Sequence, residues 1–370
     1  MKILFFHADM LGWATYTRTI ESYVQQRSDI EVLFVRQSKP QYTGASRNVA
    51  KRWKLGGTLA RSYRRNILAG AKYYCAVKKF KPAVVHIAGH SLARIPSILN
   101  FDIPLVASCD GTEYQSLKMG TGESESVNTK AWRSEKKLLQ TMSEIHCTSE
   151  WSASSVIDDF QVERNKVCVT PYSILPQANK RLSVESENFL PNVMFVGNDF
   201  TRKGAKELVS LHQKKFKHRF HLHIFSKEMP SDLTSENVSV HNNVTHTELI
   251  DRWYPRMDVF ILPSKYDQTP YAVIEALSFG LPVIVTDVGG LPELVRFGEA
   301  GIVVPKNDKE ELARAIDSVL ENDSLRISLS SNALNHFESR YSSKIIVPKF
   351  IDRLVEIGNS HNGANNANRH

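Results

Sequence analysis

Residues 258–295 constrain the fold more than any other part of the chain. They begin with a short apolar and β-branched run, Asp258–Leu262, which is typical of a strand buried on both faces. A helix is expected over about Tyr271–Phe279, because Pro270 suits the first turn of a helix and Gly280 with the next proline ends it. A second apolar run, a Gly-Gly turn and another helix follow. This order predicts a parallel sheet covered by helices.

The same alternation runs through both halves of the chain, with helical stretches between short apolar runs. In the first half the expected strands are Lys2–His7, Ile30–Val35, Pro82–Ile87, Pro104–Ser108, Glu144–Thr148 and Lys166–Thr170. In the second half they are Asn192–Gly197, Phe220–Phe225, Val238–His241, Asp258–Leu262, Pro282–Thr286 and Gly301–Val304. The pattern predicts an α/β protein with two doubly wound parallel sheets, whose ligands bind at the carboxyl ends of the strands.

The breaks in the pattern suggest how the chain divides. We expect a first domain over residues 1–172, a linker at 173–191 that is rich in Ser, Glu and Asn, and a second domain over 192–343. A last helix is expected at 344–358. The polar, low-complexity residues 359–370 are expected to be disordered.

Two carboxylates lie in the loop and the helix of residues 258–295. Asp267 lies in the loop and Glu275 just over one turn into the helix, with seven residues between them. The N–H groups that begin the helix, over 269–272, attract anions. Either acid alone is more simply explained as a solvated side chain. Together they suit a sugar that carries a phosphate, because the amides take the phosphate and the carboxylates accept hydrogen bonds from hydroxyls.

A second motif, Phe195–Gly204 (FVGNDFTRKG), joins a strand to a helix start. Gly197 ends the strand, and Arg202 and Lys203 stand where the helix begins. Cations at this end of a helix oppose the helix dipole, so an anionic ligand explains the pair better than chance exposure does.

These motifs resemble the donor site of GT-B glycosyltransferases, in particular the retaining family 4. The residues that carry the resemblance are Asp267, Glu275, Gly280–Pro282–Val283 and Gly289–Gly290–Leu291–Pro292–Glu293. The family usually has Glu at the position of Asp267, and Arg at the position of Asn198. Glu150 and Trp151 match a Ser-Glu-Trp-Ser segment of the family, for which a structural role is expected.

The resemblance implies two Rossmann-like domains that face each other across a cleft, with the last helix crossing back to the first domain. It implies that Asp267, Arg202 and Lys203 act on the reacting groups, Asp267 not as a nucleophile. It implies donor contacts from Gly197, Arg202, Lys203, Thr269, Pro270, Tyr271, Ala272, Glu275, Val244 and Gly12. Trp13, His90 and Asp110, near the ends of strands in the first half, are candidates for the acceptor side.

Basic residues are concentrated in one segment. The chain of 370 residues has a formal net charge of +8, yet Arg36–Lys81 alone holds thirteen Lys and Arg and no Asp or Glu. Within it, residues 58–79 have helical spacing, with an apolar stripe at Leu59, Ala60, Tyr63, Ile67, Ala71, Tyr74 and Cys75. The stripe alone is what a core-facing helix shows, but the excess of cations favours docking on an anionic membrane.

The favoured function is a retaining hexosyltransferase. It moves a sugar from a nucleotide-diphosphate sugar to a hydroxyl of a lipid-linked or cell-surface polysaccharide or lipopolysaccharide acceptor. No metal or other cofactor is expected. Scattered cysteines and the lack of a spanning apolar run favour a cytoplasmic protein, peripheral on the inner face of the membrane.

Other functions stay open to different degrees. No G-x-G-x-x-G follows a strand, which argues against a Rossmann dehydrogenase. A sugar epimerase or phosphorylase of the same fold is harder to exclude. A nucleic-acid-binding protein is the rival from another class, but the basic segment contains no recognised nucleic-acid module, so no nucleic acid is expected as a partner.

Overall fold

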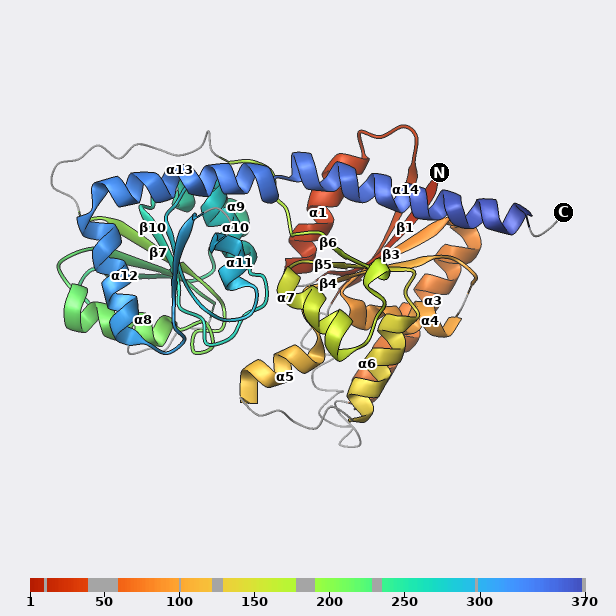
Figure 1. Ribbon diagram of the computed structural model, residues 1–370, viewed down its shortest axis with the longest axis horizontal. Helices are drawn as coiled ribbons and strands as arrows, with labels where there is room; N and C mark the ends of the chain where they lie inside the picture. Colours follow the sequence, from red (N-terminus) through yellow and green to blue (C-terminus); the bar gives the residue numbers. More distant parts are fainter. Residues whose placement is uncertain are drawn as a thin grey trace, which may run out of the picture.

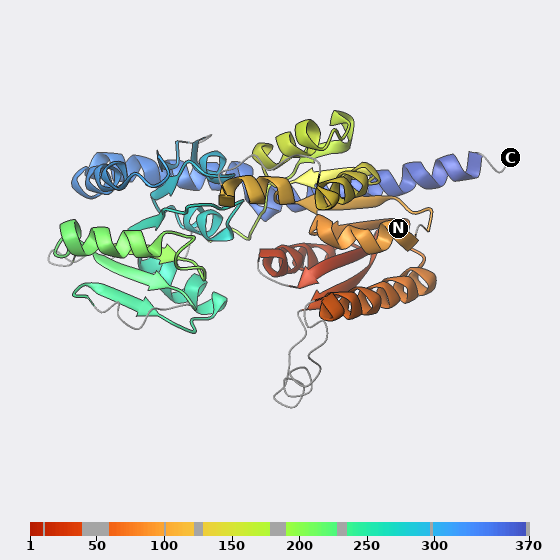
Figure 2. The same cartoon turned by 90° about the horizontal axis from the view of Figure 1, so that it is seen from below.

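The computed structural model describes residues 1–9, 12–38, 59–99, 101–121, 129–177, 190–227, 235–296 and 299–367. Two six-stranded sheets, each flanked by helices, form two lobes that lie next to each other (Figures 1 and 2). All pairs of neighbouring strands in both sheets are parallel. The predicted fold class, two doubly wound parallel sheets, is confirmed.

The first lobe has the strand order β2-β1-β3-β4-β5-β6. The central strands β3 and β4 are almost wholly buried, which explains their continuous apolar sequences. The strands are β1 Lys2–Asp9, β2 Glu31–Ser38, β3 Val84–Ala88, β4 Leu105–Cys109, β5 Glu144–Cys147 and β6 Val167–Val169. The helices are α1 Gly12–Val24, α3 Leu59–Phe80, α4 Arg94–Leu99, α5 Glu113–Thr121, α6 Lys130–Gln140 and α7 Glu150–Ser154.

The second lobe has the strand order β12-β11-β10-β7-β8-β9, so the order reverses beside β7 and β10. The strands are β7 Asn192–Val196, β8 His221–Phe225, β9 Val238–His241, β10 Val259–Leu262, β11 Val283–Thr286 and β12 Gly301–Val304. The helices are α8 Ala205–Leu211, α9 His246–Glu248, α10 Tyr271–Ser278, α11 Leu291–Arg296, α12 Lys309–Glu321 and α13 Asp323–Arg340. The loops after β7 and β10 therefore meet at a switch point, where ligands of such sheets bind.

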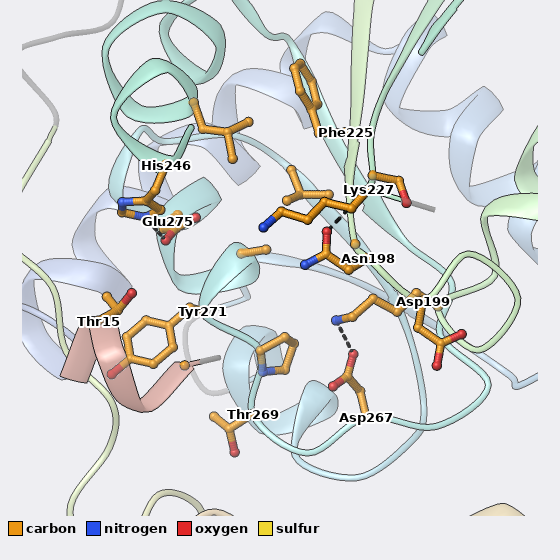
Figure 3. A pocket seen from close by; sticks show the side chains of 18 of the residues that line it. Thr15, Asn198, Asp199, Phe225, Lys227, His246, Asp267, Thr269, Tyr271 and Glu275 are labelled. Atoms are coloured by element: carbon orange, nitrogen blue, oxygen red, sulfur yellow. Dashed lines mark hydrogen bonds and ion pairs between the residues drawn. The ribbon is translucent and has the colours of Figure 1, made fainter. Parts of the chain in front are cut away.

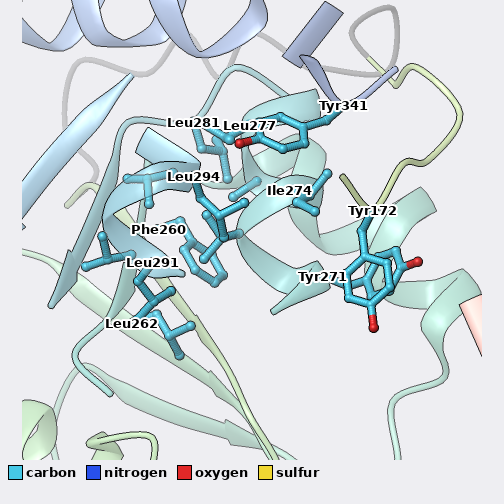
Figure 4. Packing of buried hydrophobic residues seen from close by; sticks show 14 of the residues in the cluster. Tyr172, Phe260, Leu262, Tyr271, Ile274, Leu277, Leu281, Leu291, Leu294 and Tyr341 are labelled. Carbon is cyan, nitrogen blue, oxygen red and sulfur yellow. The ribbon is translucent and has the colours of Figure 1, made fainter. Parts of the chain in front are cut away.

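The core of the second lobe fixes the helix that carries Glu275. Ile274 and Leu277 of α10 are fully buried, close to Phe260 of β10 and to Leu294 of α11 (Figure 4). Each such side chain contributes about 1.5–3 kcal/mol when it leaves water. The helix is therefore held by its apolar face, and its N-terminus is directed toward the other lobe.

The last helix, α14 Ser343–Ala367, crosses from the second lobe to the first, as predicted (Figure 1). Its Arg353 forms an ion pair with the buried Glu144 of β5 at 2.6 Å, and its Phe350 packs edge-on against His86 at 4.9 Å. The expected disordered tail is wrong over residues 359–367, which are helical. Extending a helix that is already nucleated costs little, and His361 Nε2 lies 3.0 Å from the Asp102 carbonyl oxygen, which ties the extension to the first lobe.

The predicted linker at 173–191 falls mostly outside the described residues. At its start, Ile174 accepts a hydrogen bond from Ser343 N–H at 2.9 Å and donates one to the Tyr341 carbonyl at 3.2 Å. The two chain crossings between the lobes therefore lie against each other. The domain limits at 172, 192, 343 and 358 stay predictions.

Helix α3 corrects the predicted apolar stripe. Ala69, Tyr73 and Val77 are buried, whereas Tyr74 is 46% exposed and Ala71 is exposed too. Tyr73 packs against Phe6 of the sheet. Apolar residues occupy two faces of this helix, and over residues 68–80, whose side chains are described, spacing alone selected the wrong face. The side chains of the other predicted stripe residues, Leu59, Ala60, Tyr63 and Ile67, lie outside the described part of the structure. None of the helices in the described part of the chain is long and apolar enough to cross a bilayer.

Candidate active site between the lobes

A cavity of about 790 Å³ opens between the two lobes at the switch point of the second sheet (Figure 3). The second lobe provides most of its lining, including Gly197, Arg202, Lys203, Val244, Asp267, Thr269, Pro270, Tyr271, Ala272 and Glu275. The first lobe provides Gly12, Trp13, Thr15, Arg18, Asp110 and Tyr172. Every donor-side residue named from the sequence lines this one cavity.

The two cations and the loop acid form one ionic cluster. Lys203 Nζ lies 2.8 Å from Asp267 Oδ2, and Arg202 Nη1 lies 3.7 Å from Asp267 Oδ1. Asp267 is 9% exposed, and its oxygens also accept hydrogen bonds from Ser264 and from Gln268 N–H. Lys203 is therefore held by the Asp267 carboxylate, whereas Arg202 is held mainly by Asp199, which accepts a hydrogen bond from its Nε at 2.9 Å, and by the Tyr266 carbonyl, which accepts one from its Nη1 at 2.8 Å.

Two glycines are required for this cluster. A Cβ at Gly197 would lie 2.3 Å from Lys203 Cδ, so a larger residue there would displace the lysine side chain from its path to Asp267. Gly204 has φ near +80°, and a Cβ there would lie 2.0 Å from the Pro263 carbonyl oxygen. These contacts give the glycines of the FVGNDFTRKG motif a structural reason.

The N-terminus of α10 faces the same space. Its N-cap residue is Pro270, which has no side-chain acceptor for the first N–H groups of the helix. The Tyr271 ring packs on the Tyr172 ring at 4.5 Å and against Gly12, where a Cβ would lie 3.0 Å from the ring. The first N–H groups of the helix, at Tyr271 and Ala272, line the cavity wall and can donate hydrogen bonds to an anion there.

Glu275 is held by two residues that the sequence reasoning missed. Its Oε1 lies 2.7 Å from His246 Nε2, and its Oε2 accepts a hydrogen bond from the Tyr254 hydroxyl at 3.0 Å. The Glu275 hydrogen bond raises the pKa of His246 above its usual value. The Thr-x-x-Glu pattern over residues 245–248 signals a capped helix start there, which could have indicated His246.

Aromatic rings line the far end of the second lobe's side of the cavity. Phe225 stacks on His241 at 4.6 Å, and His241 contacts Trp253 at 4.2 Å. Phe225, His241 and Val244 all line the cavity. A flat ring such as a nucleotide base fits beside such a wall.

Two of the three acceptor-side candidates line the cavity, and the third does not. Trp13 and Asp110 line the cavity, and burial raises the pKa of the Asp110 carboxyl. His90 does not line it. Its Nε2 lies 2.7 Å from Glu135, a buried residue of α6 in the first lobe.

Two sequence motifs meet across the lobes. Glu293, at the end of the Gly-Gly-Leu-Pro-Glu turn, accepts hydrogen bonds from Glu150 N–H at 2.6 Å and Trp151 N–H at 3.3 Å. Thr148 and Thr269 add a hydroxyl pair at 3.0 Å. The Ser-Glu-Trp-Ser segment thus contacts the second lobe through two of its backbone N–H groups.

No group of three or more His, Cys, Asp or Glu in the described ranges is arranged to hold a metal ion.

The fold is shared with proteins of known structure. Sucrose-phosphate synthase from Thermosynechococcus elongatus superposes with a TM-score of 0.77 at 16% identity, over 97% of this chain and 100% of that one. HepE of Anabaena in complex with UDP gives a TM-score of 0.71 at 17% identity, over 96% and 100%. Two lobes of this architecture define the GT-B fold.

Sequence comparison identifies the family. Residues 12–174 match Glycosyltransferase Family 4, and residues 190–322 match Glycosyl transferases group 1. Between them the two matches span most of the chain, which therefore belongs to the family 4, or group 1, glycosyltransferases. The capsular polysaccharide biosynthesis glycosyltransferase CapM of Staphylococcus aureus is 34% identical over 94 residues, 25% of each chain. The alignments with the first curated relatives span 20–51% of those proteins.

Proposed function

We propose that this protein is a retaining glycosyltransferase that moves a sugar from a nucleotide-diphosphate sugar to an acceptor hydroxyl. One observation carries the proposal: Arg202, Lys203 and the N-terminus of α10 face the same cavity as Glu275. Cations and backbone N–H groups bind the negative charge of a diphosphate, and a carboxylate accepts hydrogen bonds from ribose hydroxyls. The complex of HepE with UDP supports a uridine nucleotide as one candidate.

The proposed chemistry uses charge stabilisation more than proton transfer by side chains. The bond between the sugar C1 and the diphosphate oxygen breaks, and its electron pair leaves on the diphosphate. Arg202, Lys203 and the α10 amides stabilise that charge, so that the cavity binds the transition state better than the substrate. The acceptor oxygen bonds to C1 from the same face, and its proton passes to the leaving phosphate. Asp267 accepts hydrogen bonds from the sugar hydroxyls and does not attack C1.

Binding of UDP, GDP and ADP to cation variants tests this assignment. We expect Lys203→Met and Arg202→Met each to weaken the preferred nucleotide by about 10–100-fold, because each removes a hydrogen bond to a charged group worth about 1.5–3 kcal/mol. Lys206→Met, at an exposed position of α8, is the matched control and should bind as the wild type does. A double variant of Arg202 and Lys203 with unchanged affinity would remove the assignment.

The acceptor is proposed to be a lipid-linked or cell-surface glycan reached from an anionic membrane. The first lobe exposes Leu68 and Tyr74 of α3 together with Ile98 of α4, which are 64%, 46% and 80% exposed. Helices α3 and α4 are packed together, and the Lys78 ammonium lies 5.8 Å from the Tyr74 ring centre. No Asp or Glu occurs between residues 31 and 102 of the sequence. Apolar side chains within a field of cations suit an anionic bilayer surface.

Printed names of relatives support this acceptor class. CapM is named for capsular polysaccharide, LpcC of Rhizobium leguminosarum for the lipopolysaccharide core, and WaaG for lipopolysaccharide biosynthesis.

Cosedimentation with liposomes tests the membrane surface. The protein should bind phosphatidylglycerol vesicles and not phosphatidylcholine vesicles, and salt should release it because it screens the attraction. Ile98→Ser should weaken binding, whereas Ile327→Ser, which removes a side chain 65% exposed on α13, should not. Equal binding to both lipids, or equal effects of the two variants, would argue for a soluble acceptor.

A further inference from the structure

The carboxylate of Glu275 is held from two sides by a single connection of the chain. His246 begins α9, directly after β9, and Tyr254 begins the short 3-10 helix Tyr254–Arg256 that leads to β10. Both therefore come from the segment between β9 and β10, and they bond to different oxygens of Glu275 at 2.7 and 3.0 Å. Figure 3 shows the His246 ring next to the Glu275 carboxylate at the cavity wall.

The backbone that presents His246 is itself fixed. Thr245 is the N-cap of α9, and its hydroxyl accepts a hydrogen bond from Glu248 N–H while the Glu248 carboxylate bonds back to Thr245 N–H. This capping box leaves His246 as the first residue of the helix, at a defined angle. The imidazole is 41% exposed at the side chain, whereas Glu275 is only 5% exposed. A half-exposed ring thus covers and orients an almost buried carboxylate.

The hydrogen-bond capacity of Glu275 fits a diol. An ionised carboxylate has about four positions that accept hydrogen bonds. His246 and Tyr254 occupy one on each oxygen, which leaves one position on each oxygen for a ligand. A ribose has two adjacent hydroxyls at the spacing of two carboxylate oxygens. Without both of these hydrogen bonds the carboxylate can rotate, and its two open acceptor positions then no longer face the same side of the cavity.

We propose that His246 is a positioning residue that orients Glu275 to accept both ribose hydroxyls of the donor nucleotide. This inference rests on the proposed function, since it assumes that a nucleoside diphosphate binds in the cavity. His246 lies outside both sequence motifs, and it acts on the nucleotide through Glu275 and not on the reacting atoms.

Calorimetric titration of four proteins tests the proposal. Wild type, His246→Ala, His246→Gln and the control His218→Ala are titrated with UDP, GDP and ADP, and with the 2′,3′-dideoxy form of the nucleotide that binds best. His218 is 69% exposed at the side chain and lies outside the cavity lining. Thermal melts check that each variant is folded.

We expect His246→Ala to weaken the ribonucleotide about tenfold and the dideoxy nucleotide less than twofold. His246→Gln should restore most of the affinity, because its amide N–H can donate to Glu275 from about the same place as Nε2. His218→Ala should bind as the wild type does.

Three results would overturn the proposal while the proposed function stands. These are unchanged affinity in His246→Ala, tighter binding in it, or equal losses for the ribose and dideoxy forms. If the wild type binds none of the three nucleotides, the proposed function fails, and this inference fails with it.

Discussion

A buried chain of histidines in the first lobe predicts strong acid sensitivity. His7 Nε2 lies 2.8 Å from His86 Nδ1, and His86 Nε2 lies 2.9 Å from the Ser108 hydroxyl. Both rings are fully buried beneath α1 and α14. Burial, with a smaller effect of Arg36, lowers the pKa of His7 from 6.5 to about 3, and burial lowers that of His86 well below 6.5. The rings are neutral in the folded protein and become protonated on unfolding at acid pH.

The sign and size of the effect follow from proton linkage. A histidine with a lowered folded pKa contributes stability that is present above 6.5 and is lost as the pH falls toward the folded pKa. The loss approaches about 1.4 kcal/mol per pH unit for a ring that stays neutral in the folded protein, and for His7, whose folded pKa is about 3, it amounts to about 2 kcal/mol between pH 7 and pH 5. His223 adds to it, with a pKa lowered to about 3, first by burial. His90 and His246, whose pKa values are raised, act in the opposite direction.

Urea unfolding at pH 7 and pH 5, followed by tryptophan fluorescence, measures the loss. His7→Gln removes the ring whose folded pKa is about 3, so its free energy of unfolding should fall by about 2 kcal/mol less between the two pH values than that of the wild type. Its lower stability at pH 7 does not enter this difference. His218→Gln, at an exposed position, is the control. Equal pH dependence in His7→Gln and the wild type would refute the reasoning.

Two other substitutions test the contacts between the lobes. The Tyr271 hydroxyl is buried and has no hydrogen-bond partner among the described residues. Tyr271→Phe should therefore keep the stacking on Tyr172 and raise the free energy of unfolding by about 1 kcal/mol. A lower melting temperature of this variant would contradict the prediction. Glu293→Ala removes the acceptor of the two α7 amides and should lower the free energy of unfolding by about 1–2 kcal/mol. It should also increase the radius of gyration measured by X-ray scattering. An unchanged scattering curve would show that the arrangement of the lobes does not depend on this contact.

The sequence was sufficient to predict the sheets, because strands buried on both faces have continuous apolar sequences. It also located the cations and acids of the second lobe, since their motifs follow the strands on either side of the switch point. Arg202, Lys203, Asp267 and Glu275 do meet in one cavity.

Pairings between distant segments could not be predicted. His246 and Glu275 are separated by 29 residues, and nothing local shows that their side chains meet. His90 stands near the end of a strand, as many ligand-binding residues do, but a buried acid from α6 takes its Nε2. Helix α3 has apolar residues on two faces, so only packing against Phe6 decides which face is buried. The polar end of α14 is helical because the helix is already formed before it.

Asp267 connects the two halves of the proposed donor site. Its Oδ2 lies 2.8 Å from the Lys203 ammonium and accepts a hydrogen bond from the Ser264 hydroxyl at 3.2 Å. A diphosphate that binds Lys203 competes with this carboxylate, because the ammonium has only three donors and a fixed stem across Gly197. Each bond that the lysine transfers to phosphate leaves an acceptor position on Asp267, next to the place where the sugar must lie. Under the proposed function, diphosphate binding thus prepares the carboxylate for the sugar hydroxyls, and the ion pair with Lys203 holds the short side chain of Asp267 at the wall of the cavity.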